Sequence, residues 1–171
     1  MDHIRLELRP VALEDCAKLL QFELSNQPYF EQFVPPRPDG FLSQRGMEKS
    51  VGQLIEEITC KTGAYYLLKR DQEIVGRFNF EVGKNGAANL GYRLGQNQTG
   101  QGLATLGLKM AITRARVDLN IEKIHAETTL DNLASIRVLE KCGFSRIGIN
   151  ISGGVLHDQK VDLVQFEKKS P

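Results

Sequence analysis

Residues 90–105 read LGYRLGQNQTGQGLAT, and this stretch decides the fold of the chain. Its first part, Leu90–Leu94, is predicted to be a strand, and its glycine-rich part leads into a helical pattern that ends near Leu119. A further strand is predicted over Ile121–Thr129. A strand, a helix and a second strand in this order imply a parallel pairing, so we expect a mixed sheet.

Hydrophobic spacing predicts the elements on either side of this stretch. It changes between the alternation typical of strands and the repeat typical of amphipathic helices. The predicted order is βααβββαβαββ, an α/β mixture that we expect to form one domain over residues 1–171. The remaining predicted elements are strands 4–9, 64–69, 73–82, 144–151 and 155–166 and helices 13–24, 44–58 and 132–142, with the last two strands joined at Gly153-Gly154.

A stretch rich in proline and aromatic residues, Asn26–Phe41, lies between the first two predicted helices. Its prolines disfavour regular structure, and its rings need a surface to pack against. Two interpretations stay open: the rings anchor a loop on the core, or they line a substrate pocket. The residues concerned are Pro28, Pro35, Pro36 and Pro38 and the aromatic Tyr29, Phe30, Phe33 and Phe41.

The composition argues against several classes of protein. The chain has 171 residues, 41% hydrophobic and 25% charged, as expected for a folded domain. Its net charge of +1 offers little attraction for nucleic acid or an anionic membrane, so we expect neither as a partner. The cysteines and histidines show no metal-ligand spacing, and no metal is expected. Because we find neither a signal peptide in MDHIRLELRP nor an apolar stretch of membrane-spanning length, we expect a cytoplasmic protein.

The glycine-rich turn before the long predicted helix is a candidate anion site. Gly100, Gly102 and the small Ala104 let a ligand approach backbone N–H groups that have no partner inside the helix. Phosphate is the natural ligand of such a turn, although a plain tight turn would have the same sequence. The turn lacks the Gly-Lys-Ser/Thr of a P-loop, and Thr105 stands where a dinucleotide fingerprint needs a small residue.

Three motifs of the chain resemble the GNAT acetyltransferase superfamily. They are Gly91–Leu94, Gly100–Thr105 and Asn132–Phe144, the last of which reads NLASIRVLEKCGF. This last motif and the closing GVLHD at 154–158 are similar to the RimJ/RimL branch, which acetylates the N-terminal amine of ribosomal proteins. The family pattern carries Gln or Arg where this chain has Thr99, a position that commonly contributes its backbone amide.

The resemblance implies a fold and a co-substrate. The fold is a mixed, largely antiparallel, twisted sheet of about seven strands with about four helices, whose central parallel strands splay apart for acetyl-CoA. Backbone amides of the glycine-rich turn would bind the pyrophosphate, and a backbone N–H at the end of the preceding strand would stabilise the oxyanion. The implied cofactor-binding residues are Leu94, Gly95, Thr99, Gly100, Gln101, Gly102, Leu103, Ala104, Thr105, Asn132, Ser135 and Arg137.

The resemblance also implies two catalytic candidates. Glu127 stands late in a predicted strand, where some members of the family carry the base that deprotonates the amine. A carboxylate that is merely exposed to solvent would give the same sequence pattern. Ser135 would donate a proton to the departing thiolate, because Leu139 stands where some relatives have a tyrosine. Asn132, which the resemblance makes a partner of the pantetheine amide, is also predicted as the N-cap of its helix.

Together these observations predict an acetyl-CoA-dependent N-acetyltransferase whose acceptor is the N-terminal α-amine of a protein, with a ribosomal protein as the implied partner. The alternatives are a polyamine, an amino acid or an antibiotic as acceptor, and a CoA-binding sensor without catalysis. A polyamine site would need several acids, and the stretch Phe30–Phe41 offers only Glu31 and Asp39. A monomer and a homodimer are both compatible with the sequence.

Overall fold

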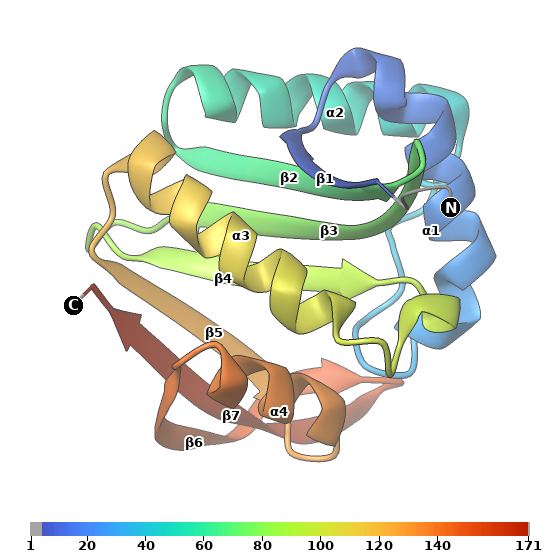
Figure 1. Cartoon of the computed structure of the whole chain (residues 1–171). Helices are drawn as coiled ribbons and strands as arrows, with labels where there is room; N and C mark the ends of the chain where they lie inside the picture. Colours follow the sequence, from blue (N-terminus) through green and yellow to red (C-terminus); the bar gives the residue numbers. More distant parts are fainter. Residues whose placement is uncertain (1–4, 171) are drawn as a thin grey trace.

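The centre of the molecule is one seven-stranded sheet, seen in a computed structural model that describes residues 5–170 (Figure 1). The strand order is β1-β2-β3-β4-β5-β7-β6; β4 and β5 run parallel, and every other neighbouring pair is antiparallel. This confirms the predicted mixed sheet. The strands are β1 (Leu6–Pro10), β2 (Gly63–Arg70), β3 (Glu73–Val82), β4 (Ala88–Leu94), β5 (Lys123–Thr129), β6 (Ser145–Leu156) and β7 (Gln159–Lys169).

The parallel pairing of β4 with β5 is short. It joins Ala88 to Ile124, Asn89 to His125 and Leu90 to Ala126, and the described residues show no pair beyond it. Both strands continue, β4 against β3 and β5 against β7. The sheet therefore opens between β4 and β5 after Leu90, as the resemblance implies.

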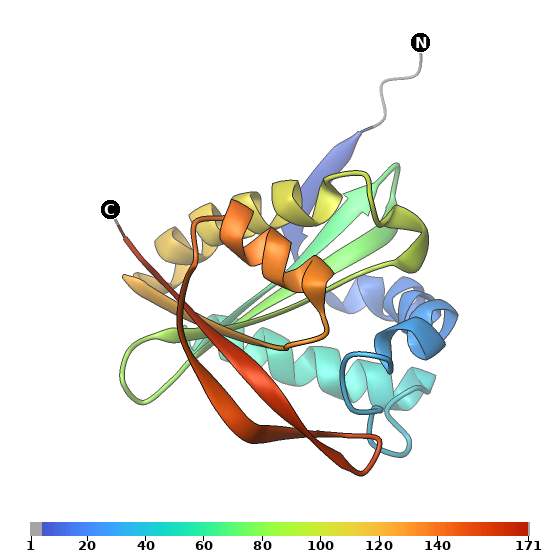
Figure 2. The same ribbon diagram turned by 90° about the horizontal axis from the view of Figure 1, so that it is seen from below.

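Helices cover both faces of the sheet. Figure 2 shows α1 and α2 on one face and α3 and α4 on the other. Strand β2 is buried on both faces because Tyr66 and Leu68 belong to the core under α3 and α4, whereas Tyr65 and Leu67 pack with α1 and α2. The helices are η1 (Leu13–Asp15), α1 (Cys16–Phe30), α2 (Gln44–Thr59), η2 (Gln96–Gln98), α3 (Leu103–Leu119) and α4 (Leu133–Lys141).

The expected break of the first helix near Asn26 is wrong. Helix α1 continues through Pro28 to Phe30, although proline removes the hydrogen bond to the carbonyl four residues earlier. Burial offsets this loss, because Phe30 is 5% exposed and its ring centroid lies 5.6 Å from that of Phe22. The irregular segment begins only after Glu31.

The predicted hairpin turn at Gly153-Gly154 is also wrong. Strand β6 runs through both glycines to Leu156, and the chain reverses at His157-Asp158, whose φ angles are 50° and 60°. Two left-handed residues in a row form the type of turn that matches the twist of a hairpin. The glycines instead lie at an irregularity in the pairing with β7, where a Cβ on Gly153 would collide with Asn150.

Of the first predicted strand, Ile4 lies outside the described residues, and β1 begins at Leu6. The other predicted elements are found with small shifts of their ends. Strand β3 has the predicted range 73–82, and the helix predicted over 44–58 is one residue longer.

Two glycines inside helices provide a matched test of the packing of α3. A Cβ on Gly107 of α3 would lie 2.7 Å from Cζ of the fully buried Phe78, whereas a Cβ on Gly52 of α2 would meet nothing within 4 Å. We expect Gly107→Ala to lower the free energy of unfolding by about 1–3 kcal/mol, because the core must move to admit the methyl group. Gly52→Ala should raise it by up to about 1 kcal/mol through helix propensity.

Urea denaturation of the two variants and the parent chain measures both changes. A Gly107→Ala variant as stable as the parent would show that α3 is not packed closely against the sheet.

Candidate active site

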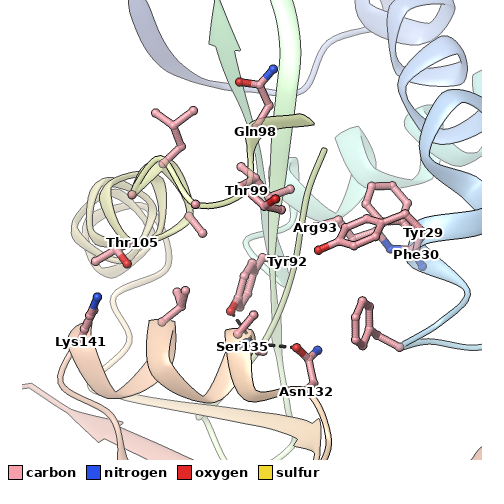
Figure 3. A pocket seen from close by; sticks show the side chains of 18 of the residues that line it. Tyr29, Phe30, Tyr92, Arg93, Gln98, Thr99, Thr105, Asn132, Ser135 and Lys141 are labelled. Atoms are coloured by element: carbon pink, nitrogen blue, oxygen red, sulfur yellow. Dashed lines mark hydrogen bonds between the residues drawn. The ribbon is translucent and has the colours of Figure 1, made fainter. Parts of the chain in front are cut away.

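A cavity of about 320 Å³ lies where the sheet opens, between the start of α3, the helix α4 and the end of α1 (Figure 3). Its wall includes the end of β4 and the glycine-rich turn, two segments that the resemblance assigns to acetyl-CoA. Nine of the predicted cofactor-binding residues line it: Leu94, Thr99, Gly100, Gly102, Leu103, Ala104, Thr105, Asn132 and Ser135.

The geometry of the glycine-rich turn suits an anion. Gly100 and Gly102 both have φ of +75°, and a Cβ on either would meet no atom within 4 Å, so the space beside them is open. Gly102 is the N-cap of α3. The amides of residues 103–105 have no partner inside the helix and donate to no other residue within 5–170. They are therefore available to phosphate oxygens, as the N-terminus of a long helix favours.

Two further side chains on the cavity wall fit a ligand such as acetyl-CoA. The buried Oε1 of Gln98 has no hydrogen-bond partner among the described residues, so it can accept an N–H from a ligand. Lys141, at the end of α4, brings a positive charge to the side of the cavity where α3 begins (Figure 3). Gln98 is not among the predicted cofactor-binding residues.

Three predicted cofactor-binding residues do not line this cavity. The amide of Gly95 donates to the carbonyl of Val75, 2.9 Å away, so it remains part of the sheet. The side chain of Gln101 accepts from Arg70, and Arg137 is exposed on α4. The structure thus gathers the predicted turn but leaves these residues at its margin.

A second cavity of about 400 Å³ lies against the same opening of the sheet. It is bounded by β3, β4, β5, the segment after α1 and the β6–β7 hairpin, which arches toward that segment in Figure 2. The two cavities share part of their walls, so they meet between β4 and β5. The shared residues are Phe33, Val34, Tyr92, Arg93, Asn132 and Ser135.

Ser135 and Tyr92 meet at the junction of the two cavities. Their hydroxyl oxygens lie 3.0 Å apart, and Asn132 Oδ1 accepts the Ser135 amide at 3.1 Å, which confirms Asn132 as the N-cap of α4 (Figure 3). Burial raises the pKa of Tyr92 to about 12, so its phenol stays protonated at neutral pH. Two hydroxyl groups able to relay a proton therefore stand where the cavities join.

Glu127 lines the second cavity from β5. It is exposed, and its Oε1 accepts a hydrogen bond of 2.7 Å from Gln165 on β7. His125 lies on the same face of the strand, as alternation predicts, but it pairs with Glu167 at 3.2 Å. The structure therefore separates His125 from Glu127 by giving each its own partner on β7.

A buried glutamate holds three arginines at the wall of the second cavity. Glu23 of α1 is 1% exposed and bonds Arg37 at 3.0 Å, Arg77 at 2.8 Å and Arg93 at 2.9 Å. Burial alone would raise the pKa of Glu23, but the three guanidinium groups together hold it below its usual value. Burial lowers the pKa of Arg93 to about 10, and the repulsion of the neighbouring arginines adds to this effect.

Sequence reasoning missed this cluster and the role of Tyr92. Arg77 and Arg93 are charged residues inside predicted strands, and they lie opposite each other in the β3–β4 register. A charged residue in the middle of a predicted strand was the available sign that a buried partner of opposite charge would be needed. Their common partner, Glu23, is 54 and 70 positions away in the chain, so only the fold reveals it.

The Glu23 cluster predicts an acid-sensitive fold. Because the folded pKa of Glu23 lies below the usual 4.5, its contribution to stability is complete above pH 4.5 and is lost as the pH falls below it. At pH 7, Glu23→Gln should lower the free energy of unfolding by about 3–5 kcal/mol, since it leaves the buried Arg77 and the half-buried Arg37 and Arg93 without their carboxylate. The difference from the parent chain should shrink as the pH falls from 5 to 3.5.

Denaturation midpoints at pH 7, 5 and 3.5 test this expectation. The control is Glu14→Gln, which removes an exposed pair with Arg9 and should cost less than about 1 kcal/mol at any pH. A Glu23→Gln variant with the same difference from the parent at each pH would contradict the assignment.

Neither a membrane-spanning helix nor a cluster of metal ligands is found within residues 5–170. The described helices include none of the length and apolar character needed to cross a membrane. The same residues bring together no group of three His, Cys, Asp or Glu side chains that could hold a metal ion.

Comparison with known proteins agrees with this geometry. Over 164 residues, covering 90% of each chain, the sequence is 29% identical to a probable N-acetyltransferase, YjcK, of Bacillus subtilis. The structure is similar to ribosomal-protein-S5-alanine acetyltransferase from Vibrio fischeri, with a TM-score of 0.93, 18% identity and coverage of 99% of this chain and 96% of that one. It is also similar to RimL, a ribosomal L7/L12 α-N-protein acetyltransferase in complex with coenzyme A, with a TM-score of 0.89, 24% identity and coverage of 96% and 94%.

The match to a family is extensive. Residues 5–145 match the acetyltransferase (GNAT) domain, which includes the glycine-rich turn, the opening of the sheet and α4. The turn, its free amides and the cavity beside them fit acetyl-CoA, the co-substrate of this family. The chain is thus a member of the GNAT family of acetyltransferases and uses acetyl-CoA as its acyl donor.

Proposed function

We propose that this enzyme transfers the acetyl group of acetyl-CoA to the N-terminal α-amine of a protein, with a ribosomal protein as the first candidate. The observation that carries the proposal is the meeting of two cavities at Ser135 and Tyr92. One cavity has the anion-binding turn of a CoA site, and the other is open to a second substrate. The similarity in fold to two ribosomal-protein acetyltransferases supports the choice of acceptor.

In this proposal acetyl-CoA supplies the thioester that is attacked. The pyrophosphate of its CoA moiety binds the backbone amides of residues 101–105. The exposed carboxylate of Glu127 takes the proton that the attacking amine loses, directly or through water. An α-amine has a pKa of about 7.7–8.0, against about 10.4 for lysine, so part of it is already neutral near pH 7 and a weak base is sufficient. This favours an α-amine over a lysine side chain as the acceptor.

Ser135 is the proposed donor to the departing thiolate. When the C–N bond forms and the C–S bond breaks, the sulfur gains an electron pair and takes the hydroxyl proton of Ser135. Tyr92, 3.0 Å away, positions this hydroxyl and can pass a proton to it, which Tyr92 regains from water. A backbone N–H near Leu94, which lines the cofactor cavity, would stabilise the oxyanion that forms on the carbonyl.

The charges of the second cavity disfavour one alternative acceptor. A polyamine requires carboxylates, but this cavity is lined by three arginines and by Glu127 as its carboxylate within the described part of the chain. A CoA-binding sensor without catalysis would bind the same ligand in the first cavity, and only a measurement of turnover separates it from an enzyme.

Release of CoA thiol with a panel of amines tests the function. We expect turnover with unblocked N-terminal peptides and none with their N-acetylated forms. Ser135→Ala and Glu127→Gln should each lower kcat by at least about tenfold, because general acid and base groups contribute about a hundredfold or more in favourable cases. The matched control is Ser145→Ala at the exposed start of β6, which should retain the parent rate. Tight CoA binding with no turnover on any amine would favour the sensor.

The proposed cradle for pyrophosphate can be tested with two glycines of equal backbone strain. Gly102 and Gly86 both have φ of +75° and open space around a Cβ, but only Gly102 lies at the start of α3. Substitution by alanine strains both positions equally, by about 1 kcal/mol. Gly102→Ala should weaken CoA binding by at least about tenfold, since a methyl group enters the space of the phosphate, and Gly86→Ala should not.

Isothermal titration with CoA, together with thermal denaturation of the free proteins, measures these two effects separately. Equal CoA affinity in the two variants would contradict the assignment of the turn.

A further inference from the structure

The wall of the second cavity carries more positive than negative charge. Arg37, Arg77 and Arg93 line it together, and Glu23 behind them is the single carboxylate that binds them among the described residues. Glu127 lines the same cavity from β5, on the far side of the opening in the sheet, and its Oε1 already accepts from Gln165. The three arginines therefore form a cationic end of the cavity, opposite the carboxylate.

These arginines keep hydrogen-bonding capacity for a ligand. Glu23 accepts two N–H groups from Arg37 and one each from Arg77 and Arg93, of the five that every guanidinium carries. The hydrogen bonds that these three side chains make to residues 5–170 all go to Glu23. Their other nitrogen atoms are not among the buried polar atoms without a partner, so they are open to the cavity or to solvent.

The cluster is also held in place before any ligand binds. Arg77 is 6% exposed and lies opposite Arg93 in the register of β3 and β4. The guanidinium of Arg93 lies 5.1 Å from the centroid of the Phe30 ring, and that of Arg37 lies 4.6 Å from the centroid of Phe41. Side chains fixed in this way lose little conformational entropy when they bind an anion.

We propose that the acceptor of this enzyme is an amine with an anionic group close to it, and that Arg37, Arg77 and Arg93 bind this group while the amine faces Glu127 and Ser135. The proposal deepens the proposed function and rests on it. A carboxylate or a phosphate on the acceptor would balance the excess charge, and guanidinium groups bind either one in a charge-assisted geometry. The anion has two possible sources, an acidic side chain near a protein N-terminus or the carboxylate of a free amino acid.

The experiment compares acceptors of similar size that differ in charge, with rates expressed per concentration of neutral amine. The peptides begin Ser-Glu, Ser-Gln and Ser-Lys and are otherwise identical, and a second pair is free serine and serine amide. We expect kcat/KM to be at least about tenfold higher for the anionic member of one of these two sets, since a hydrogen bond to a charged group contributes more than the 1.4 kcal/mol that corresponds to a factor of ten. A preference for Ser-Glu identifies a protein N-terminus, and a preference for serine identifies an amino acid.

Two variants of the least buried arginine link the preference to the cluster. The side chain of Arg37 is 24% exposed. Arg37 lines the second cavity but not the first. Arg37→Gln should reduce the anionic preference at least threefold, and Arg37→Lys should restore part of it. Arg45→Gln, an exposed arginine of α2 outside both cavities, removes the same charge and should leave the preference unchanged. Titration with CoA and thermal denaturation show whether each variant is folded.

Binding to the CoA complex distinguishes the failure of this inference from the failure of the proposed function. Calorimetric titration of the same peptides and amino acids measures the charge preference without turnover. Turnover with equal kcat/KM for the three peptides, and equal kcat/KM for serine and its amide, would overturn the inference. The proposed function would then still hold. Selective binding of the anionic members without turnover would overturn the function and retain the inference. A preference for Ser-Lys would also overturn the inference.

Discussion

The parallel pairing of β4 with β5 stops after Leu90, and the active site depends on this interruption. A fully paired sheet would close the space that now joins the two cavities through Tyr92, Asn132 and Ser135. The interruption is tolerated because each strand keeps its other neighbour, β3 for β4 and β7 for β5, and because α3 and α4 cover the face of the sheet with a continuous core.

Local patterns of the sequence were sufficient for the order of the elements and for the glycine-rich turn. Periodicity reports burial on one face, and it places the apolar side of α2 against the sheet. Strand β3 at 73–82 is buried on both faces, and a strand-like run after a polar turn was sufficient to predict it. The turn was equally visible, because a left-handed residue such as Gly102 at the start of a helix needs no distant partner. The conformation of the glycine-rich turn is therefore largely a local property.

Contacts between distant residues were not visible in the sequence. Pro28 remains helical because Phe30 packs on Phe22, and the hairpin turns at His157-Asp158 because Gly153 is needed for an irregularity opposite β7. Both errors come from treating proline and glycine as local signals when tertiary packing decides. The pairing of Tyr92 with Ser135 on α4, and of Glu23 on α1 with Arg77 and Arg93, depends on the packing of helices against the sheet in the same way.

The cluster around Glu23 serves stability and substrate binding with the same side chains. During evolution, selection for a new acceptor and selection for a stable fold therefore act on the same residues. Loss of any of these arginines changes the balance of a buried charge, so change is easier elsewhere on the cavity wall. The second cavity is also lined by uncharged residues, Val34 and Pro35 after α1 and Val155 on the β6–β7 hairpin. Relatives with different acceptors are expected to differ at these positions first.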